Sequence, residues 1–206
     1  DDRLSPKLER EIKKFLSDLF FTVKDYDLVL VLDYGHGFFT PLLRKFLCAL
    51  PHFLAVNAQT NTANLGFNPI TKYSKADYFC LDDKELRLAY QDNSSDINVL
   101  IRRLVRRATN HPRAVTVTRG HLGATTYDAK NHLFFEAPVL SQKIVDTTGA
   151  GDAFLALTAP CVAKGFPLDL VTFIGNAAGA LAVGILGNRS SIEAEPFFKF
   201  ITALLK

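Results

Sequence analysis

The feature that most constrains the fold is the alternation of short apolar runs with longer amphipathic stretches along the 206-residue chain. Apolar runs typical of buried strands occur at 28–32, 53–56, 76–81 and 115–118. Stretches with helical spacing surround them at 7–21, 41–50, 82–90 and 96–109. Strands that alternate with helices favour a parallel sheet with helices on both faces. We therefore predict a single α/β domain over residues 1–206.

The later part of the chain carries further strand and helix patterns. Two short runs, 124–127 and 132–135, flank a polar turn and predict a β-hairpin. Ile144 and Val145 are predicted to lie in another strand. Helices are expected after it, at 153–162, 168–186 and 192–205. Because ligands of such sheets bind beyond the carboxyl ends of the strands, polar residues that follow strands are the first candidates for a site.

Composition and charge argue against several classes of protein. Apolar residues make up 48% and charged residues 22% of the chain, as in folded globular proteins. No apolar run reaches membrane-spanning length and no signal peptide is visible, so we expect a cytoplasmic protein without a membrane partner. A net charge of +3 is too small to indicate nucleic acid as a partner, and three scattered cysteines favour reduced thiols. The chain starts at Asp1 and contains no methionine, which favours a piece of a longer protein.

Residues 146–154 read D-T-T-G-A-G-D-A-F and are the most informative stretch of the sequence. Gly149 and Gly151 allow a tight turn before a helix, and the small Ala150 keeps the turn open to a ligand. The first N–H groups of a helix lack intrahelical acceptors and carry partial positive charge, so the turn suits an anion. Asp152 is expected in the first helical turn, where it could accept a proton from a hydroxyl group. Phosphoryl transfer needs both parts.

This nine-residue string resembles the signature of the ribokinase-like (PfkB) carbohydrate kinases. The resemblance implies that Asp152 is the catalytic base and that the backbone of Gly149, Ala150 and Gly151 binds the transferred phosphoryl group. It also implies a ribokinase-like fold, ATP and Mg²⁺ as cofactors, and a sugar or sugar phosphate as substrate. Only the C-terminal part of such a kinase is matched, so the N-terminal part and the small β lid are expected to be absent from this chain. The structural alternative is a glycine-rich turn with an ordinary first-turn acid.

Residues 33–37 read D-Y-G-H-G and follow the first predicted strand. The structural interpretation is a tight loop whose glycines take positive φ angles. The loop resembles D-Y-G-K-G in the bacterial heptose-7-phosphate kinases of the family, with His36 in place of lysine. By that resemblance Asp33, Gly35, His36 and Gly37 line the site near the sugar. A histidine is largely neutral at pH 7, which makes it a weaker phosphate ligand than lysine.

Polar side chains also follow the second and third predicted strands. Residues 57–68 are rich in asparagine and glutamine, whose amides suit sugar hydroxyls but also commonly bond their own backbone. Asn57 and Gln59 are the best candidates there for binding the substrate. Asp82 and Glu85 have the spacing of a helix capping box. They also resemble the family's N-x-x-E motif, with the asparagine replaced, which makes them candidates for the magnesium shell.

The nucleotide would be bound by residues from the second half of the chain. Residues 118–123 resemble the family's T-[KR]-G turn, and the resemblance implies phosphate contacts from Thr118, Arg119, Gly120 and Gly123. Asn176 lies on a predicted helix of small residues and is expected near the adenine. An exposed turn and close helix packing are the structural alternatives. Asp146 is a candidate ligand of a monovalent cation, by resemblance to some relatives.

Three hypotheses about function follow. The first is ATP-dependent phosphoryl transfer to a hydroxyl of a sugar or sugar phosphate, in the heptose-phosphate branch. Members of that branch often carry a fused nucleotidyltransferase domain, and the full-length protein could form a homodimer. The second is a module that binds nucleotide or sugar phosphate without turnover, favoured by the departures at His36 and Asp82. The third is a vitamin-type kinase of the same fold.

Overall fold

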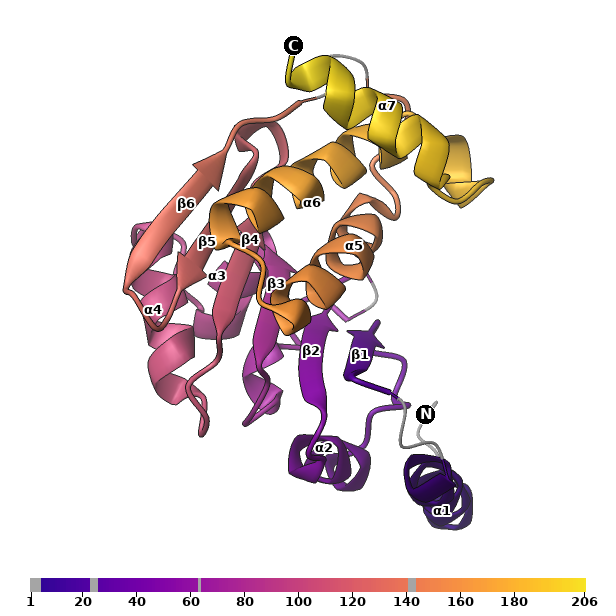
Figure 1. Ribbon diagram of the computed structural model, residues 1–206. Coiled ribbons are helices and arrows are strands. Elements are labelled where there is room, and N and C mark those ends of the chain that lie inside the picture. The colour runs from indigo at the N-terminus through magenta and orange to yellow at the C-terminus, as the bar shows by residue number, and fades with distance from the viewer. Residues whose placement is uncertain (1–4, 23–25, 63, 141–143) are drawn as a thin grey trace. The chain divides into compact units, whose positions relative to one another are not determined.

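The computed structural model describes residues 5–22, 26–62, 64–140 and 144–206 of the chain (Figure 1). Six strands lie within these ranges, and their order in the sheet is β1-β2-β3-β4-β5-β6. The pairs β1–β2 and β2–β3 are parallel, whereas β4–β5 and β5–β6 are antiparallel. The α/β class is confirmed, but the sheet is mixed because the predicted hairpin belongs to it.

The chain forms two compact units, which are described separately. The first unit comprises the residues up to Phe79 together with Lys84–Pro112, and the second comprises Cys80–Asp83 and Arg113–Lys206.

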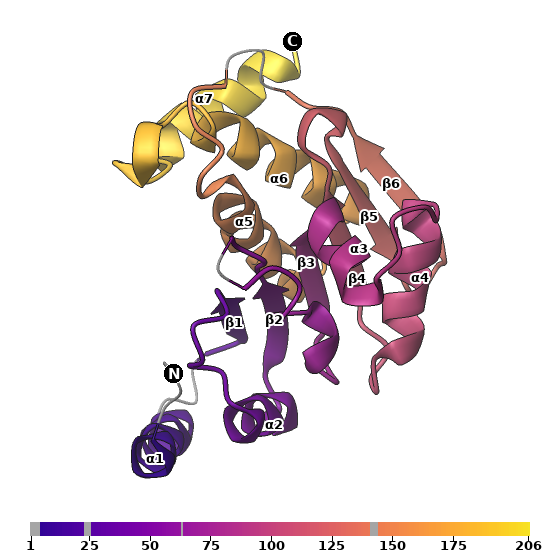
Figure 2. The same cartoon turned by 180° about the vertical axis from the view of Figure 1, so that it is seen from behind.

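The elements that lie wholly or largely in the first unit, in chain order, are α1 (Pro6–Thr22), β1 (Leu28–Asp33), α2 (Pro41–Ala49), β2 (Phe53–Ala58), η1 (Ile70–Lys72), α3 (Asp83–Tyr90) and α4 (Ile97–Arg107). Strand β3 (Tyr78–Asp82) begins in this unit and ends in the second. Helix α2 starts where expected, because the Thr40 side chain accepts a hydrogen bond from the N–H of Leu43. Figure 2 shows α3 and α4, and the guanidinium of Arg103 on α4 lies 4.4 Å from the ring centroid of Tyr90 on α3.

Burial in the first unit differs between its strands. Leu54 and Val56 of β2 and Phe79 of β3 are buried, as expected for central strands. In β1, by contrast, Leu30 is 36% exposed, so the prediction that this strand is buried on both faces is wrong. The reason is that, among the strands that the structure describes, β1 stands at the end of the order and is paired with β2.

The elements of the second unit are β4 (Ala114–Thr118), η2 (Gly120–Leu122), β5 (Ala124–Asp128), β6 (Leu133–Ala137), α5 (Ala150–Lys164), α6 (Leu168–Ala182), η3 (Leu186–Asn188) and α7 (Ala194–Leu204). The antiparallel pairing of β5 with β6 confirms the predicted hairpin. Helix α6 packs against β5 and β6, and it also contacts α5 and α7 (Figure 1). Phe154 of α5 is buried, and its ring lies against the backbone at Gly175 of α6.

Two predicted boundaries in the second unit are wrong. Ile144 and Val145 do not form a strand, and both are exposed. The N–H groups of Val145 and Asp146 instead donate to the carbonyl oxygen of Val183, at 2.8 and 3.1 Å. The helix predicted over 168–186 ends at Ala182, shortly before a glycine at position 184, a residue with low helix propensity.

No helix in the part of the chain that the structure describes combines the length and apolar character needed to span a membrane. All three cysteines are thiols, with Cys80 buried and the other two partly exposed.

Candidate active site

The signature turn of the second unit has a backbone that only glycine adopts easily. Gly149 precedes α5 with φ 79° and ψ −3°, in the left-handed region. The N–H of Ala150 donates to the carbonyl oxygen of Thr147, and the N–H of Ala153 donates to that of Gly149. Asp152 lies in the first turn of the helix and is partly buried. The sequence thus places a carboxylate and a helix N-terminus in one short segment, which suits an anion beside a proton acceptor.

Asp146 braces this turn from its N-terminal side. One carboxylate oxygen accepts the N–H of Thr148 at 2.9 Å, and the other accepts the N–H of Gly187 at 2.9 Å. Hydrogen bonds from Thr148, and then from Gly187, lower the pKa of the Asp146 carboxyl. The charged carboxylate therefore links the signature turn to the segment that follows α6. Its expected role as a cation ligand remains a prediction.

Two residues predicted to contact the nucleotide pack against the end of β6. The Asn176 amide of α6 donates to the carbonyl oxygens of Ala137 and Pro138, at 2.7 and 3.1 Å. A Cβ atom added at Gly123 would lie 2.9 Å from the carbonyl carbon of Pro138 and closer still to the oxygen of Ala137. Asn176 therefore anchors α6 to the hairpin, so close helix packing accounts for part of its role.

The turn between β4 and β5 forms as the sequence suggests. Thr118 ends β4 opposite Ala124 of β5, and the N–H of Arg119 donates to the carbonyl oxygen of Gly123 at 2.7 Å. Gly120 opens the short η2 helix inside this turn and is exposed. The phosphate contacts expected of these residues remain predictions.

In the first unit, Asp33 is buried instead of being presented to solvent. It is 2% exposed, and its Oδ2 atom lies 2.6 Å from both the Tyr73 hydroxyl and the Lys72 Nζ. Its Oδ1 atom accepts the N–H of Gly35 at 3.0 Å. Both oxygens are thus engaged by the protein, and a direct contact of Asp33 with a substrate stays a prediction.

The remaining residues of the 33–37 loop differ in their surroundings. Gly35 has φ +77°, and a Cβ atom there would lie 2.9 Å from the Asn68 side chain and closer still to that of Asn64. The space beside Gly35 is therefore filled by an amide of the protein. His36 is exposed and Gly37 is partly exposed, so these two remain the candidates for direct contact with a substrate.

Three asparagines of the 57–68 segment hold the two loops together. Asn61 and Asn64 each donate a side-chain N–H to the carbonyl oxygen of Tyr34, at 3.1 and 3.0 Å. Asn68 is buried and donates to the carbonyl oxygens of Asp33 and Gln59, at 2.8 and 3.0 Å. All three amides therefore bond backbone of the protein, mostly that of the 33–37 loop and not that of their own segment.

The two residues singled out as substrate ligands lie at the end of β2. Asn57 is buried, and the N–H of Gln59 donates to the carbonyl oxygen of Asp33 at 2.8 Å. Both stay predictions as ligands.

The two carboxylates predicted for the magnesium shell lie at the end of β3 and at the start of α3. Glu85 in the first turn of α3 accepts the N–H of Thr60 at 3.0 Å, and Asp82 ends β3 with an exposed side chain. Within the described ranges, no three histidine, cysteine or acidic side chains cluster as metal ligands. Mg²⁺ is commonly held by one or two carboxylates, water and substrate phosphates, and Glu85 and Asp82 stay predictions as members of its shell.

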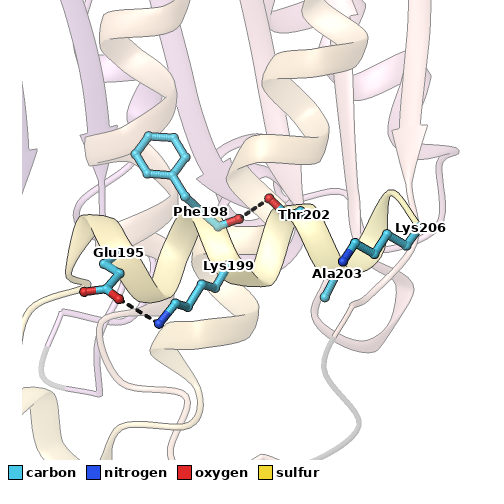
Figure 3. Close-up of a pocket in the computed structure, with 6 residues that line it drawn as sticks. All are labelled: Glu195, Phe198, Lys199, Thr202, Ala203 and Lys206. Carbon is cyan, nitrogen blue, oxygen red and sulfur yellow. Dashed lines mark hydrogen bonds and ion pairs between the residues drawn. The ribbon is translucent and has the colours of Figure 1, made fainter.

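Figure 3 shows an open hollow on the surface of α7. None of the predicted site residues lines it. It is lined by Glu195, Phe198, Lys199, Thr202, Ala203 and Lys206. The ion pair between Lys199 and Glu195 spans 2.6 Å, and both side chains are largely exposed. Because all six residues come from a single helix and its end, this surface encloses no ligand site.

Residues 62–195, more than half of the chain, match the model of the pfkB family carbohydrate kinases. The chain belongs to the pfkB family. The matched range of this pfkB family chain includes the signature turn, whereas the 33–37 loop lies outside it.

Curated relatives are similar to this pfkB family chain over only part of their length. The bifunctional protein HldE of Haemophilus ducreyi is 36% identical over 81 residues, which is 39% of this chain and 17% of the relative. HldE of Campylobacter fetus is 26% identical over 173 residues, which is 82% of this chain and 36% of the relative. The chain thus spans well under half of these proteins.

Solved structures share the fold of this pfkB family chain. Phosphofructokinase-2 from Escherichia coli in complex with potassium has a TM-score of 0.75 at 16% identity, covering 99% of this chain and 64% of the other. Ribokinase of Arabidopsis thaliana, complexed with ribose and ATP, has a TM-score of 0.69 at 18% identity, covering 98% and 60%. The predicted ribokinase-like fold is confirmed.

Proposed function

We propose that this chain is the catalytic and nucleotide-binding part of a kinase that transfers the γ-phosphoryl group of ATP to a hydroxyl of a sugar or sugar phosphate. The observation that carries the proposal is the left-handed turn at Gly149, which opens α5 with Asp152 in its first helical turn. Family membership supports the same chemistry, because the match covers this turn.

Each residue of the turn has a distinct task in this reaction. Asp152 accepts the proton of the acceptor hydroxyl as its oxygen attacks the γ-phosphorus, and the bond to the oxygen of ADP breaks. The backbone N–H groups of residues 149–151 would stabilise the negative charge on the phosphoryl oxygens, that of Ala150 by exchanging its 3.3 Å bond to Thr147 for the ligand. When bound, Mg²⁺ neutralises charge on the phosphates of ATP. Glu85 would hold it through water, with Asp82 nearby in the sequence.

The similar proteins favour a phosphorylated acceptor. The HldE relatives are named bifunctional, and the D-Y-G-x-G loop at 33–37 resembles the heptose-phosphate branch. We therefore propose heptose 7-phosphate as the first acceptor to test and a nucleotidyltransferase domain as the second activity of the full-length protein. The potassium in the phosphofructokinase-2 structure supports keeping Asp146 as a candidate ligand of a monovalent cation.

Replacing Asp152 by asparagine tests the proposal, with Asp169→Asn as a matched control. Asp169 is an exposed acid in the first turn of the neighbouring helix α6, so the same chemical change is made at the start of another helix. We expect Asp152→Asn to lower kcat by about 10²–10⁴-fold, the usual contribution of a general base, while the Kd of Mg-ATP in calorimetric titration changes little. The control should keep both values. Turnover is measured as ADP release in the gene product that contains this chain, with heptose 7-phosphate, ribose, fructose 6-phosphate and pyridoxal as acceptors.

Three outcomes separate the hypotheses. Loss of turnover in Asp152→Asn alone supports the kinase. Nucleotide binding without turnover on any acceptor in the wild-type protein supports a binding module instead. Turnover confined to pyridoxal supports a vitamin-type kinase of the same fold.

A further inference from the structure

A buried ion pair lies beneath the 33–37 loop of the first unit. Lys72 belongs to η1, and its side chain is 18% exposed, whereas that of Asp33 is 3% exposed. Their charged atoms lie 2.6 Å apart. The same carboxylate also accepts a hydrogen bond from the hydroxyl of Tyr73, a residue that is 1% exposed. A pair this deeply buried is sensitive to the loss of either partner, because the remaining charge would lack compensation.

The pair is tied to the loops on either side. The Lys72 ammonium also donates to the side-chain oxygen of Asn68. Asn68 in turn donates to the backbone carbonyls of Asp33 and Gln59, which follow β1 and β2 respectively. Two of the three N–H donors of Lys72 are thereby used within the protein. Burial lowers the pKa of Lys72, although the hydrogen bond that Lys72 donates to Asp33 opposes this shift.

We propose that Lys72 is a positioning residue for the 33–37 loop, acting through Asp33 and Asn68. This inference rests on the proposed function, in which the loop receives the acceptor. The ammonium holds the Asp33 carboxylate in the orientation that accepts the N–H of Gly35. The position of Gly35 then sets where His36 and Gly37 meet a substrate.

The positioning role predicts a specific kinetic effect. Without Lys72, the 33–37 loop should spend a smaller fraction of time in the conformation that binds the acceptor. The KM for the acceptor should therefore rise. The affinity for Mg-ATP should not change, because Lys72 is assigned no contact with the nucleotide. Loss of a general structural support would instead reduce the amount of folded protein and leave the KM of the remaining fraction unchanged.

Lys72→Met tests the proposal, with Lys75→Met as the matched control three residues further along the chain. Hydrogen exchange of the 206-residue chain is followed by NMR at two amides that bond Asp33, those of Gly35 and Gln59. We expect Lys72→Met to accelerate exchange at both by about tenfold or more, with β5 amides unchanged and the control close to wild type. In the gene product, the KM for heptose 7-phosphate should rise by a similar factor. Lys72→Arg should restore part of both effects.

Three results would overturn the proposal. Unchanged exchange at Gly35 in Lys72→Met is one, and equal acceleration across all of β1 and β2 is another. The third is an acceptor KM equal to that of the wild type in a variant whose Gly35 amide exchanges faster. If Lys72→Met does not fold, Tyr73→Phe removes one ligand of the same carboxylate and should accelerate the same two amides to a smaller extent. If the wild type turns over no acceptor, the proposed function fails, while local release at Gly35 and Gln59 would still support the positioning role.

Discussion

Gly175→Ala should destabilise the second unit although alanine favours helices over glycine. Gly175 lies on α6 where the ring of Phe154 from α5 packs against its backbone. A Cβ atom there would lie 2.5 Å from both Cε atoms of that ring and closer still to Cζ. Carbon atoms normally pack at about 3.5–4.0 Å, so the ring would have to move by about 1 Å or more. Phe154 is 2% exposed and has little room to do so.

The magnitude follows from two opposing contributions. Alanine in place of glycine inside a helix gains about 0.8–1.0 kcal/mol. Overpacking a buried contact costs about 1–3 kcal/mol, and a clash with three ring atoms favours the upper end of that range. The net loss for Gly175→Ala is therefore about 2 kcal/mol, or about 4–8 °C in Tm for a chain of this length.

Gly179→Ala provides the matched control on the same helix. A Cβ atom at Gly179 would meet nothing within 4 Å, so only the gain in helix propensity applies. This variant should be more stable than wild type by about 0.5–1 kcal/mol. Thermal and urea unfolding are followed by circular dichroism at 222 nm, since the chain has no tryptophan for fluorescence. Coincident transitions by circular dichroism and tyrosine fluorescence would justify a single free energy for the two units. A Gly175→Ala variant as stable as Gly179→Ala would refute the packing argument.

Two further predictions concern the first unit. Gly35→Ala should lower the free energy of unfolding by at least about 1–2 kcal/mol, because its φ of +77° is unfavourable for alanine and its Cβ atom would meet the side chains of Asn64 and Asn68; urea unfolding equal to wild type would contradict this. Burial, and then the neighbouring Asp33 charge, raise the pKa of Tyr73, so the folded state keeps this proton above about pH 10 while the unfolded chain loses it. The contribution of this group to the free energy of unfolding is fully present below about pH 10 and falls as the pH rises further. In urea titrations at pH 7, Tyr73→Phe should lower the free energy of unfolding by about 1.5–3 kcal/mol. Above about pH 10, the free energy of unfolding of this variant should decrease less steeply with pH than that of the wild type. An unchanged slope in Tyr73→Phe would show that other groups cause the decline.

Local sequence patterns predicted the elements that depend on local chemistry. The hairpin of β5 and β6 formed around its polar turn, and α2 began at its threonine cap. The signature segment forms the turn before a helix that its glycines predicted, with Gly149 in the left-handed region. The same reasoning failed for Ile144 and Val145, whose β-branched side chains favour a strand. Their segment bonds to Val183, a contact that depends on where α6 ends.

The contacts that organise the loops of the first unit could not be predicted from local sequence patterns. Lys72 and Tyr73 follow Asp33 by 39 and 40 residues, and neither spacing nor composition marks a lysine as the partner of a buried acid. The spacing of Asp82 and Glu85 predicted a capping box, and it gave no sign that Glu85 also accepts the N–H of Thr60 in a different loop. Such pairings depend on which strand ends lie next to one another in the folded sheet. Local sequence patterns do not predict these long-range neighbours.

The carboxylate of Asp146 bears on how the signature turn matures during synthesis. One of its hydrogen-bond donors, Gly187, lies 41 residues further along the chain, whereas the others belong to the turn itself. A nascent chain that has just extended through the turn therefore lacks the donor beyond α6 until all of α6 and the start of η3 have left the ribosome. The anion-binding turn should reach its final form late, and a protein truncated after α5 should carry the full D-T-T-G-A-G-D motif without the geometry that the motif adopts here.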